Sequence, residues 1–416
     1  MKQGKTGVAI DVGTTTVALH IIDMETGIKL ATVSGVNAQS PYGADVTERI
    51  RYCAQNGHEK LTNLIREQIA SMITEACTQA GTKAENIEYV AIAANTIMQH
   101  LAAGYSPVSM GVAPFTPTSL FGKEFPAWEG LPVAKSALVY YPPAISAYVG
   151  GDITAGLLAA EFEKIKEPAI LLDIGTNGEI VLKHENTYYC CAAAAGPAFE
   201  GAEITMGMTA QAGAINHVKL DDNNEIEYTT IGETAPIGFC GSGLLDMLAV
   251  LLDTGAVDET GRLSGKDKYY LTKHEGHTPN QAPSQATSQV GKGHDIYITA
   301  GDIRKLQLAK AAIAAGIEVL LHFAGISHDD VKTLALAGGF GSYMDTQSAA
   351  RIGLFPKSLL HVAKTLGNTA GEGAALAVSS FEAKTQLKRI FEKCEYIELS
   401  SIAFFNDKFV EHMTFE

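Results

Sequence analysis

The sequence lacks the cysteine patterns that bind metal clusters. Its 416 residues include six cysteines, and no two of them form a Cys-x-x-Cys pair. Zinc and iron–sulfur sites need several closely spaced thiolates or imidazoles. We therefore expect reduced, structural thiols, including the adjacent pair Cys190 and Cys191, and no iron–sulfur cluster in this chain.

An excess of basic residues and long apolar runs are also missing. Lys and Arg total 31 against 46 Asp and Glu, so the formal net charge is −15. A nucleic-acid-binding domain usually has a basic face, and nucleic acid is therefore not an expected partner. No apolar run approaches the roughly 20 residues that cross a bilayer, and no signal-peptide core begins the sequence. These absences predict a soluble, cytoplasmic protein without a membrane partner.

Glycine and alternating strand and helix patterns are plentiful, which indicates an α/β protein. Residues 7–35 predict three strands joined by short turns, and two helices, a buried strand and a further helix are predicted up to residue 104. Residues 169–196 predict three strands again, and helical segments follow. Because the order of elements recurs, the sequence predicts two related lobes.

A short motif is repeated at the start of both halves. It reads VAIDVGTTTVA at residues 8–18 and ILLDIGTNGEI at residues 170–180. A glycine directly after a strand permits a hairpin whose backbone N–H groups point at one anion. Asp11 and Asp173 precede the turns, where a carboxylate can hold Mg²⁺ beside phosphates. The phosphate-binding candidates are Gly13, Thr14, Thr15 and Thr16 in the first loop, and Gly175, Thr176, Asn177 and Gly178 in the second.

A third glycine-rich segment follows a predicted buried strand at residues 331–337. The segment consists of Gly338, Gly339, Phe340 and Gly341. Glycines at this place let a flat ring and a ribose lie against the backbone, so the segment is a candidate adenosine loop. An apolar helix is predicted before it, with Asp302 as N-cap. Lys310 lies on that helix and is either a lining residue of the base pocket or a solvated lysine.

In kind and in order, the three loops resemble those of the superfamily of actin, the seventy-kilodalton heat-shock chaperones and sugar kinases. There each lobe supplies one phosphate loop, and ATP lies between the lobes. The resemblance implies an α/β, actin-like (ribonuclease H-like), two-lobed ATPase fold with a nucleotide cleft between duplicated lobes, and with ATP and Mg²⁺ as cofactors. Residues 142–162 and 366–380 match the two helices that connect the lobes.

The same resemblance implies domain boundaries. We expect residues 1–165 to form the first lobe, with an irregular loop at 108–132. Residues 166–370 should form the second lobe, which includes a flexible polar insertion at 277–293. Residues 371–416 should comprise a C-terminal connecting helix and a closing segment that returns toward the first lobe.

A narrower resemblance rests on several phrases that occur in order. They include NAQSPYGADVTERI, GPAFEGAEITMGMTAQAGAI, IGFCGSGLLDML and LAGGFGSYMD. They resemble the reductive activators of corrinoid proteins. The resemblance implies ATP hydrolysis coupled to the return of Co(II) corrinoid to Co(I), on a partner corrinoid protein of a methyltransferase system. It also suggests a homodimer.

Such activators commonly carry an N-terminal iron–sulfur domain, whereas this sequence begins directly with the actin-like part. We therefore expect either an excised domain or a stand-alone form. In both cases a separate or excised iron–sulfur electron donor supplies the electrons.

Hydrolysis needs a carboxylate that orients water. The catalytic candidates are Asp11, Asp152 and Asp173, with Glu179 as a further one. Helix capping explains Asp152 equally well, and it is the simpler explanation of Asn95.

Gly241 and Ser242 open a predicted helix, where they either contact an anion or ribose or permit tight packing. His100 and His217 lie among apolar sequence neighbours and are expected to be structural rather than cobalt ligands.

Two other functions remain open at this point. A small-molecule kinase of the same fold would use a base such as Asp152 beside the γ-phosphate. A non-enzymatic, ATP-switched binding module would bind the nucleotide without turning it over.

Overall fold

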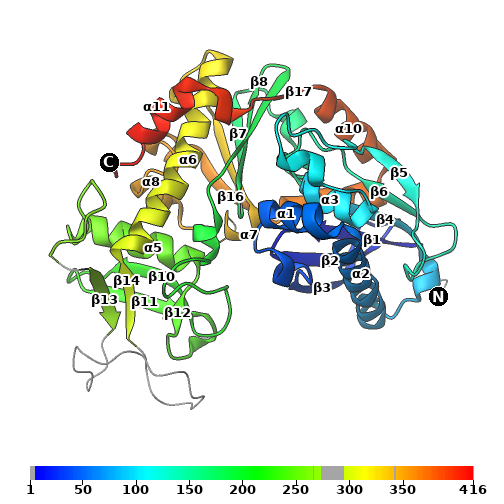
Figure 1. Ribbon diagram of the computed structural model, residues 1–416, viewed down its shortest axis with the longest axis horizontal. Coiled ribbons are helices and arrows are strands. Elements are labelled where there is room, and N and C mark those ends of the chain that lie inside the picture. The colour runs from blue at the N-terminus through cyan, green and yellow to red at the C-terminus, as the bar shows by residue number, and fades with distance from the viewer. Residues whose placement is uncertain (1–4, 266, 273–294, 342, 416) are drawn as a thin grey trace.

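The computed structural model describes residues 5–265, 267–272, 295–341 and 343–415 of the protein, and it contains two lobes (Figure 1). The first lobe contains the strands β1 (Thr6–Val12), β2 (Thr16–Asp23), β3 (Lys29–Val36), β4 (Ile87–Ala94), β5 (Lys123–Pro126) and β6 (Leu138–Tyr141). Its helices are α1 (Val46–Asn56), α2 (Glu59–Ala80), α3 (Thr96–Ala103) and α4 (Gly151–Ala159).

The second lobe is larger. Its strands are β7 (Ala169–Ile174), β8 (Gly178–His184), β9 (Thr187–Ala193), β10 (Ala214–Leu220), β11 (Ile226–Thr230), β12 (Gly238–Phe239), β13 (Lys268–Thr272), β14 (Ile296–Thr299), β15 (Thr333–Ala337), β16 (Ala363–Gly367) and β17 (Cys394–Tyr396). The helices of this half of the chain are α5 (Gly241–Asp253), α6 (Ala300–Ala324), α7 (Gly338–Gly341), α8 (Thr346–Arg351), α9 (Thr369–Ser379), α10 (Phe381–Glu392) and α11 (Ala403–Glu411).

Five strands of the two large sheets share one topology, and the sixth strand, β5 or β17, lies at opposite edges of the two sheets. The first has the order β3-β2-β1-β4-β6-β5, and the second has the order β16-β15-β7-β8-β9-β17. In the first, β1 pairs antiparallel with β2 and parallel with β4. In the second, β7 pairs antiparallel with β8 and parallel with β15. This duplication confirms the predicted actin-like, two-lobed α/β fold.

The lobes are joined by the crossing of α4 and α9, in which small residues permit a close approach. A Cβ atom on Gly373 would lie 2.0 Å from the carbonyl oxygen of Ala155, and one on Gly156 would lie 2.9 Å from Thr369 Oγ1. Neither glycine therefore has room for a side chain. Between the sheets, alanines of β1, β4 and α9 pack with α4 and α10 in one buried apolar cluster.

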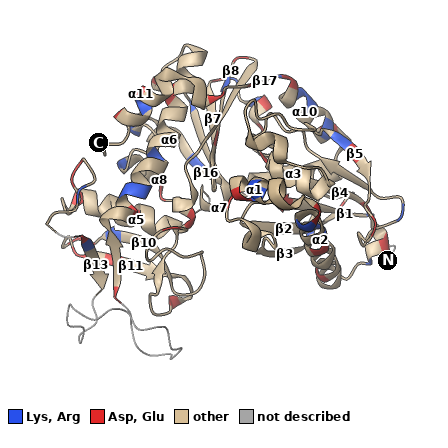
Figure 2. Ribbon diagram, viewed as in Figure 1, with Lys and Arg blue, Asp and Glu red and all other residues tan. Residues whose placement is uncertain are grey.

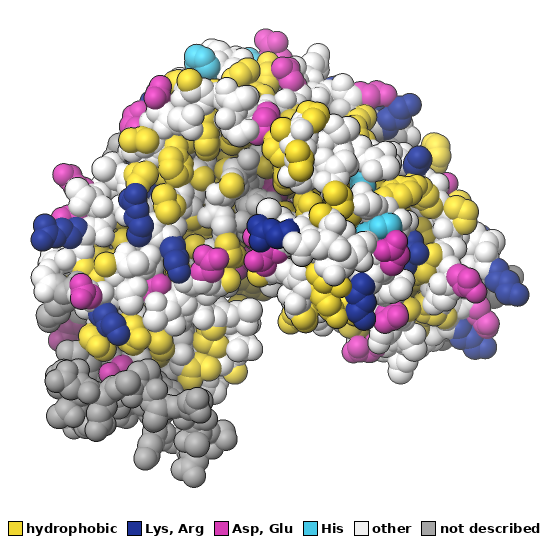
Figure 3. Space-filling view, in the orientation of Figure 1, with side chains coloured by type: hydrophobic (Ala, Val, Ile, Leu, Met, Phe, Trp, Pro, Cys, Tyr) yellow, Lys and Arg dark blue, Asp and Glu magenta, His cyan; other side chains and the backbone are white. Residues whose placement is uncertain are grey.

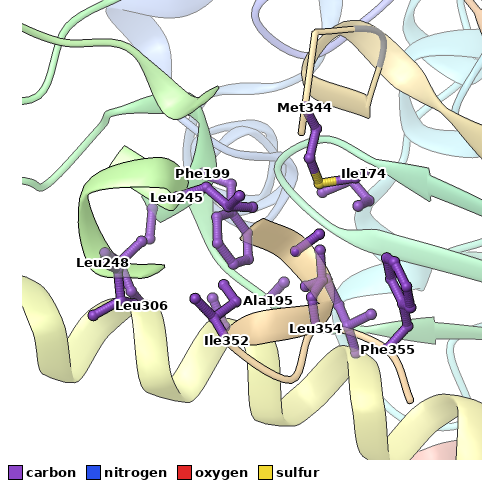
Figure 4. Packing of buried hydrophobic residues seen from close by; sticks show 14 of the residues in the cluster. Ile174, Ala195, Phe199, Leu245, Leu248, Leu306, Met344, Ile352, Leu354 and Phe355 are labelled. Carbon is purple, nitrogen blue, oxygen red and sulfur yellow. The ribbon is translucent and has the colours of Figure 1, made fainter. Parts of the chain in front are cut away.

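Separate apolar cores fill the two lobes. The first lobe buries one face of its sheet under α1, α2 and α3. The second buries its sheet under α5, α6 and α8, and Figure 4 shows part of this cluster around Phe199 and Ile352. α6 is long and apolar enough to span a membrane by length and composition, yet 78% of its most apolar window is buried in the protein, as in a core helix. Acidic and basic residues are interspersed on both lobes in the view of Figure 2.

Several local expectations need correction. The segment 108–132 was expected to be irregular throughout, but it contains β5, which pairs with the edge of β6. Asp302 is not the N-cap of α6: Thr299 is, and Asp302 is the third helical residue and completes a capping box with it. The predicted adenosine loop, residues 338–341, forms the short helix α7. The predicted insertion at 277–293 lies outside the described residues.

The end of the chain follows a different path from the expected one. α9 packs on the first sheet, as a segment that returns toward the first lobe would. After α10, however, β17 pairs with β9 of the second sheet, and α11 packs against α6. Residues 394–415 therefore complete the second lobe.

Candidate functional site: the cleft between two phosphate loops

Side chains brace the first phosphate loop from its own lobe. The Gly13 N–H donates to the carbonyl of Thr16 at 2.9 Å, which closes the β1–β2 hairpin. Asn37 holds the loop twice, because its Nδ2 donates to the Gly13 carbonyl at 2.8 Å and its N–H donates to the Thr15 carbonyl at 2.8 Å. Asn95 caps α3 and also donates from Nδ2 to Thr14 Oγ1 at 3.1 Å. The N-cap interpretation of Asn95 is thus correct, and the residue contacts the loop as well.

Arg49 of α1 lies beneath this loop and was missed in the sequence. Its side chain is fully buried, and Nη2 donates to the Thr14 carbonyl at 2.5 Å. Nη1 donates to Gln39 Oε1 at 3.1 Å, and Nε donates to the Gly43 carbonyl at 3.1 Å. Burial lowers the pKa of Arg49 to about 10, so the guanidinium stays charged at neutral pH. The loop therefore rests on a fixed positive charge.

The second phosphate loop is braced by the glycine-rich segment instead. The Gly175 N–H donates to the Asn177 carbonyl at 2.9 Å, between β7 and β8. Gly338 has a φ of +88°, and a Cβ atom there would lie 2.5 Å from Asp173 Oδ1 and 2.7 Å from the Ile174 carbonyl. Only glycine fits this position. Gly339, in contrast, has no atom within 4 Å of an added Cβ, so its face is open.

Four carboxyl groups gather between the loops, namely Asp11, Asp152, Asp173 and Glu179, which we call the carboxylate cluster. Burial raises the pKa of Asp11 to about 6, although a hydrogen bond from Asn368 Nδ2 at 2.8 Å acts in the opposite direction and lowers it. Burial and the charge of Asp11 raise the pKa of Asp173 to about 7. Burial and the charges of Asp173 and Asp11 raise the pKa of Asp152 to about 8.

Glu179 pairs with Asp173 across the β7–β8 hairpin. Burial, followed by the charges of Asp152 and Asp173, raises its pKa well above the usual range. Mutual repulsion of this kind is relieved by a bound cation, and carboxylate oxygens are the donors that Mg²⁺ prefers. The donor chemistry fits Mg²⁺, although the described residues include no group of three or more His, Cys, Asp or Glu placed to ligate a metal. An ion here would keep several waters or phosphate oxygens as ligands.

A further carboxylate, missed in the sequence, connects the two loops directly. Glu200 Oε2 accepts a hydrogen bond from Thr15 Oγ1 of the first loop at 3.2 Å and another from Thr176 Oγ1 of the second loop at 3.0 Å. The only sequence signal was its place in the phrase GPAFEGAEI, between two glycines. In Figure 3 the molecule is hollowed between the lobes.

A cavity of about 1070 Å³ lies in the second lobe, between α5, α8 and the β10–β11 hairpin. α8 follows the glycine-rich segment closely, and α5 begins at Gly241. The cavity has a buried carboxylate, Asp246, which accepts a hydrogen bond from His217 Nδ1 at 3.2 Å. Its volume is close to the upper limit of the usual range for small-molecule pockets.

Three predicted site residues have packing roles. A Cβ atom on Gly241 would lie 1.8 Å from the Phe199 carbonyl, and Ser242 Oγ donates to the Asn216 carbonyl at 2.8 Å. The packing alternative therefore accounts for both residues. Phe340 stacks on Phe199, with ring centroids 5.3 Å apart and an interplanar angle of 13°.

Lys310 does not line the cavity, and it is not solvated either. The residue is 1% exposed, and Nζ donates to the Thr414 carbonyl at 2.5 Å, above the ring of Phe415. The solvated-lysine alternative is therefore wrong. The position of Lys310 between α6 and the last residues of the chain indicates that it anchors this terminus to the second lobe.

For His100, His217 and Asp152 the sequence also allows a purely structural role. His100 is buried, its Nδ1 contacts the Thr96 carbonyl at 2.7 Å, and its Nε2 accepts from the Thr118 N–H at 3.1 Å, so it is structural as expected. His217 does not have the expected apolar surroundings, because its side chain is 52% exposed and pairs with Asp246. Asp152 does not occupy the N-cap position of α4, which belongs to Gly150, but its Oδ1 accepts a hydrogen bond from the Ile153 N–H in the first turn at 2.9 Å.

Comparisons with known proteins agree with the fold. A family model described as the C-terminal domain of RACo, the ASKHA domain, matches residues 167–416, and the RACo middle region matches residues 6–165. The corrinoid activation enzyme RamQ of Eubacterium limosum is 35% identical over 97% of this chain and 69% of its own length. The [Co(II) methylated amine-specific corrinoid protein] reductase of Methanosarcina barkeri is 27% identical over 93% of this chain and 72% of its own.

A solved structure is also similar along the whole chain. It is that of the reductive activator for corrinoid, iron–sulfur protein, with a TM-score of 0.86 and 35% identity. The match covers 100% of this chain and 67% of the other.

Proposed function

The chain belongs to the RACo family, and on that premise we propose that it is the ATP-binding and ATP-hydrolysing part of a corrinoid-protein reductive activator. In this role it couples ATP to the return of Co(II) corrinoid to Co(I) on a methyltransferase corrinoid protein. The observation that carries the proposal is the meeting of two equivalent hairpins, one from each lobe, at a shared carboxylate cluster. A nucleotide that bridges both loops would bind both lobes at once.

The nucleotide would lie across the cleft with its phosphates at the hairpins. Backbone N–H groups of both loops and the hydroxyl of Thr14 would face the phosphates, because the hydroxyls of Thr15 and Thr176 donate to Glu200. Asp11 and Asp173 would hold Mg²⁺ through its water shell, and the ion would neutralise phosphate charge. The ribose would lie over the open face of Gly339, and the base would enter the cavity beside α8.

Coupling to the corrinoid partner would use the same geometry. Closure of the lobes on Mg-ATP is a two-state change that the ligand favours by binding the closed state more tightly. A partner that also prefers one of the two states then gains or loses affinity when the nucleotide changes. The described cysteines are all free, and all but Cys394 are buried. We propose that the electrons come from an iron–sulfur donor outside this chain.

The kinase alternative has one observation in its favour. A pKa of about 8 would suit Asp152 as a general base at neutral pH, beside a hydroxyl that attacks the γ-phosphate. The two functions differ in what stimulates ATP turnover.

The test is ATP turnover with and without a Co(II) corrinoid protein, together with co-precipitation of the two proteins in the ATP-bound, ADP-bound and nucleotide-free states. We expect turnover to rise with the corrinoid protein, and co-precipitation to depend on the nucleotide. Turnover that rises with a sugar or a small acid, and not with any corrinoid protein, would contradict the proposal in favour of a kinase. Nucleotide binding without any turnover would favour a binding module.

A further inference from the structure

Glu200 is the side chain that joins the phosphate loops of the two lobes. Both hydroxyls that donate hydrogen bonds to it belong to loop residues, Thr15 and Thr176, which lie 161 positions apart in the sequence. Both hydrogen bonds reach the same carboxylate oxygen, Oε2. Glu200 therefore lies between the two phosphate loops, beside any phosphate group that both loops would hold.

The local sequence fixes this carboxylate firmly. Glu200 ends a short 3₁₀ helix, Pro197–Glu200, which Pro197 opens and Gly201 closes with a φ of +79°. A Cβ atom on Gly201 would lie 2.6 Å from the Met208 carbonyl, so this turn needs glycine. The preceding residue, Phe199, is fully buried, and Figure 4 shows its ring in the core near Leu245. Anchoring on both sides leaves the Glu200 side chain little freedom to move.

The second oxygen of the carboxylate is open. Oε1 has no hydrogen-bond partner among the described residues, and it lies 3.7 Å from the position of a Cβ atom on Gly175. It is therefore directed at the second phosphate loop, with its lone pairs available. A water molecule between Oε1 and a phosphate held by that loop would complete the arrangement.

Glu200 also differs in charge environment from the carboxylate cluster. Neighbouring carboxylates help to raise the pKa values of Asp152, Asp173 and Glu179, which suits groups that share a cation or a proton. For Glu200, burial raises the pKa and the hydroxyls of Thr176 and Thr15 lower it. No carboxylate of the cluster contributes to this shift, so Glu200 would remain available to a water molecule if the cluster held a cation.

We propose that Glu200 is the carboxylate that orients and deprotonates the water attacking the γ-phosphate, an assignment that rests on the proposed ATPase function. The water oxygen forms a bond to the γ-phosphorus, and the bond from that phosphorus to the β–γ bridging oxygen breaks. The bridging oxygen keeps the electron pair and leaves on ADP. The water proton passes to Glu200 Oε1 and then to the released phosphate, so the carboxylate is regenerated.

The hydrogen bond from Thr15 makes this step depend on lobe closure. Thr15 belongs to the first lobe, whereas Glu200 and Thr176 belong to the second. An open cleft would break the Thr15 contact and leave the carboxylate oriented from one side only. Hydrolysis would therefore require that both lobes contact the nucleotide.

The test compares the Glu200→Gln variant with a matched control, Glu203→Gln, whose side chain is exposed in the same turn. General-base catalysis contributes roughly 100-fold to 10,000-fold in rate, so we expect kcat of Glu200→Gln to fall by at least about 100-fold. The dissociation constant for Mg-ATP should change by less than about 3-fold, because glutamine keeps the size and still accepts from both hydroxyls. Glu203→Gln should match the wild type, and thermal unfolding should show that both variants are folded.

Thr15→Val and Thr176→Val provide the second measurement. We expect each to lower kcat by about 10-fold, which corresponds to one lost orienting hydrogen bond to a charged group. Undiminished turnover by Glu200→Gln, beside loss of turnover in Asp152→Asn, would overturn the assignment in favour of Asp152. Loss of Mg-ATP binding by Glu200→Gln would also overturn it, because it would make Glu200 a binding or structural residue. A wild-type chain without ATP turnover in the presence of a corrinoid protein would instead contradict the proposed function itself.

Discussion

Both phosphate loops begin with a glycine whose N–H closes the hairpin, but the first hairpin is one residue longer, and the protein supports the two loops differently. The first loop rests on polar side chains of its own lobe, Arg49, Asn37 and Asn95. The second is braced by close backbone contact with Gly338 and carries an extra carboxylate, Glu179, opposite Asp173. In the first hairpin the residue opposite Asp11 is Ala18. The duplicated hairpin therefore keeps its Asp-x-Gly-Thr start, while its length and its surroundings have diverged.

Replacing the shared aspartates tests the part of the comparison that is the same in both lobes. We expect Asp11→Asn and Asp173→Asn each to lower Mg-dependent ATP turnover by about 1000-fold, because each removes a negative oxygen that holds the cation at the phosphates. Steady-state phosphate release measures this effect. The exposed Asp407→Asn on α11 should leave turnover unchanged. Normal turnover in either aspartate variant would remove that loop from the site.

Removing Arg49 tests the support that only the first loop has. Arg49→Met keeps much of the side-chain volume but leaves the buried carbonyls of Thr14 and Gly43 without their donor. Each orphaned buried acceptor costs about 1–3 kcal/mol, so we expect the free energy of unfolding to fall by about 3 kcal/mol. Urea unfolding measures the loss. Arg51→Met, on the exposed side of the same helix, is the control. Equal stability of both variants would show that the guanidinium does not support the loop.

The pH dependence of stability tests the carboxylate cluster, most of which belongs to the second loop and α4. The folded-state pKa values of Asp11, Asp173 and Asp152 are raised to about 6, about 7 and about 8. The folded state thus holds protons that the unfolded chain has released, and stability is greatest below the ordinary carboxyl pKa of about 4. It should be lost as pH rises through these folded-state values.

Between about pH 5 and about pH 8 we expect the free energy of unfolding to fall by at least about 2 kcal/mol, without Mg²⁺ or nucleotide. Asp173→Asn should flatten this dependence, since it removes one group and one repulsive charge. Urea unfolding across the pH range is the measurement. A stability that rises over this interval would contradict the raised pKa values.

Substitutions of two adjacent glycines, Gly338 and Gly339, test the close backbone contact that only the second loop has. Gly338→Ala places a Cβ atom against Asp173 and forces a positive φ on alanine, so we expect a loss of about 1–2 kcal/mol in the free energy of unfolding. Gly339→Ala meets no atom within 4 Å and should leave stability unchanged. It should nevertheless weaken ATP binding if the ribose lies over that face. Thermal unfolding and calorimetric titration together separate the two effects, and equal behaviour of the two variants would refute the assigned contacts.

The sequence was sufficient for the loops because their signal is local. A strand, an aspartate, a glycine and a threonine determine each hairpin within about ten residues, and the alternation of strands and helices determines the lobes. The same local pattern indicated that Asn95 caps α3.

Residues that act across the fold could not be found in this way. Arg49 and Glu200 reach the loops from other elements, and no spacing rule connects them with Thr14 or Thr176. Lys310 lies on a helix that is buried nearly all round, so helical periodicity did not reveal which residues meet the chain terminus. Thr299 and Asp302 lie three residues apart and are both residue types that cap helices, and only the backbone geometry decides which of them is the N-cap.

The central claim is that the two loops form one clamp for one nucleotide. Calorimetric titration of Mg-ATP into the wild type, Asp11→Asn, Asp173→Asn and the double variant tests it most directly. We predict one site per chain and a strong loss of affinity in each single variant. The double variant should be far less impaired than the sum of the two losses, because both aspartates serve the same ligand. Binding that survives in either single variant, or two sites that are lost independently, would contradict the account.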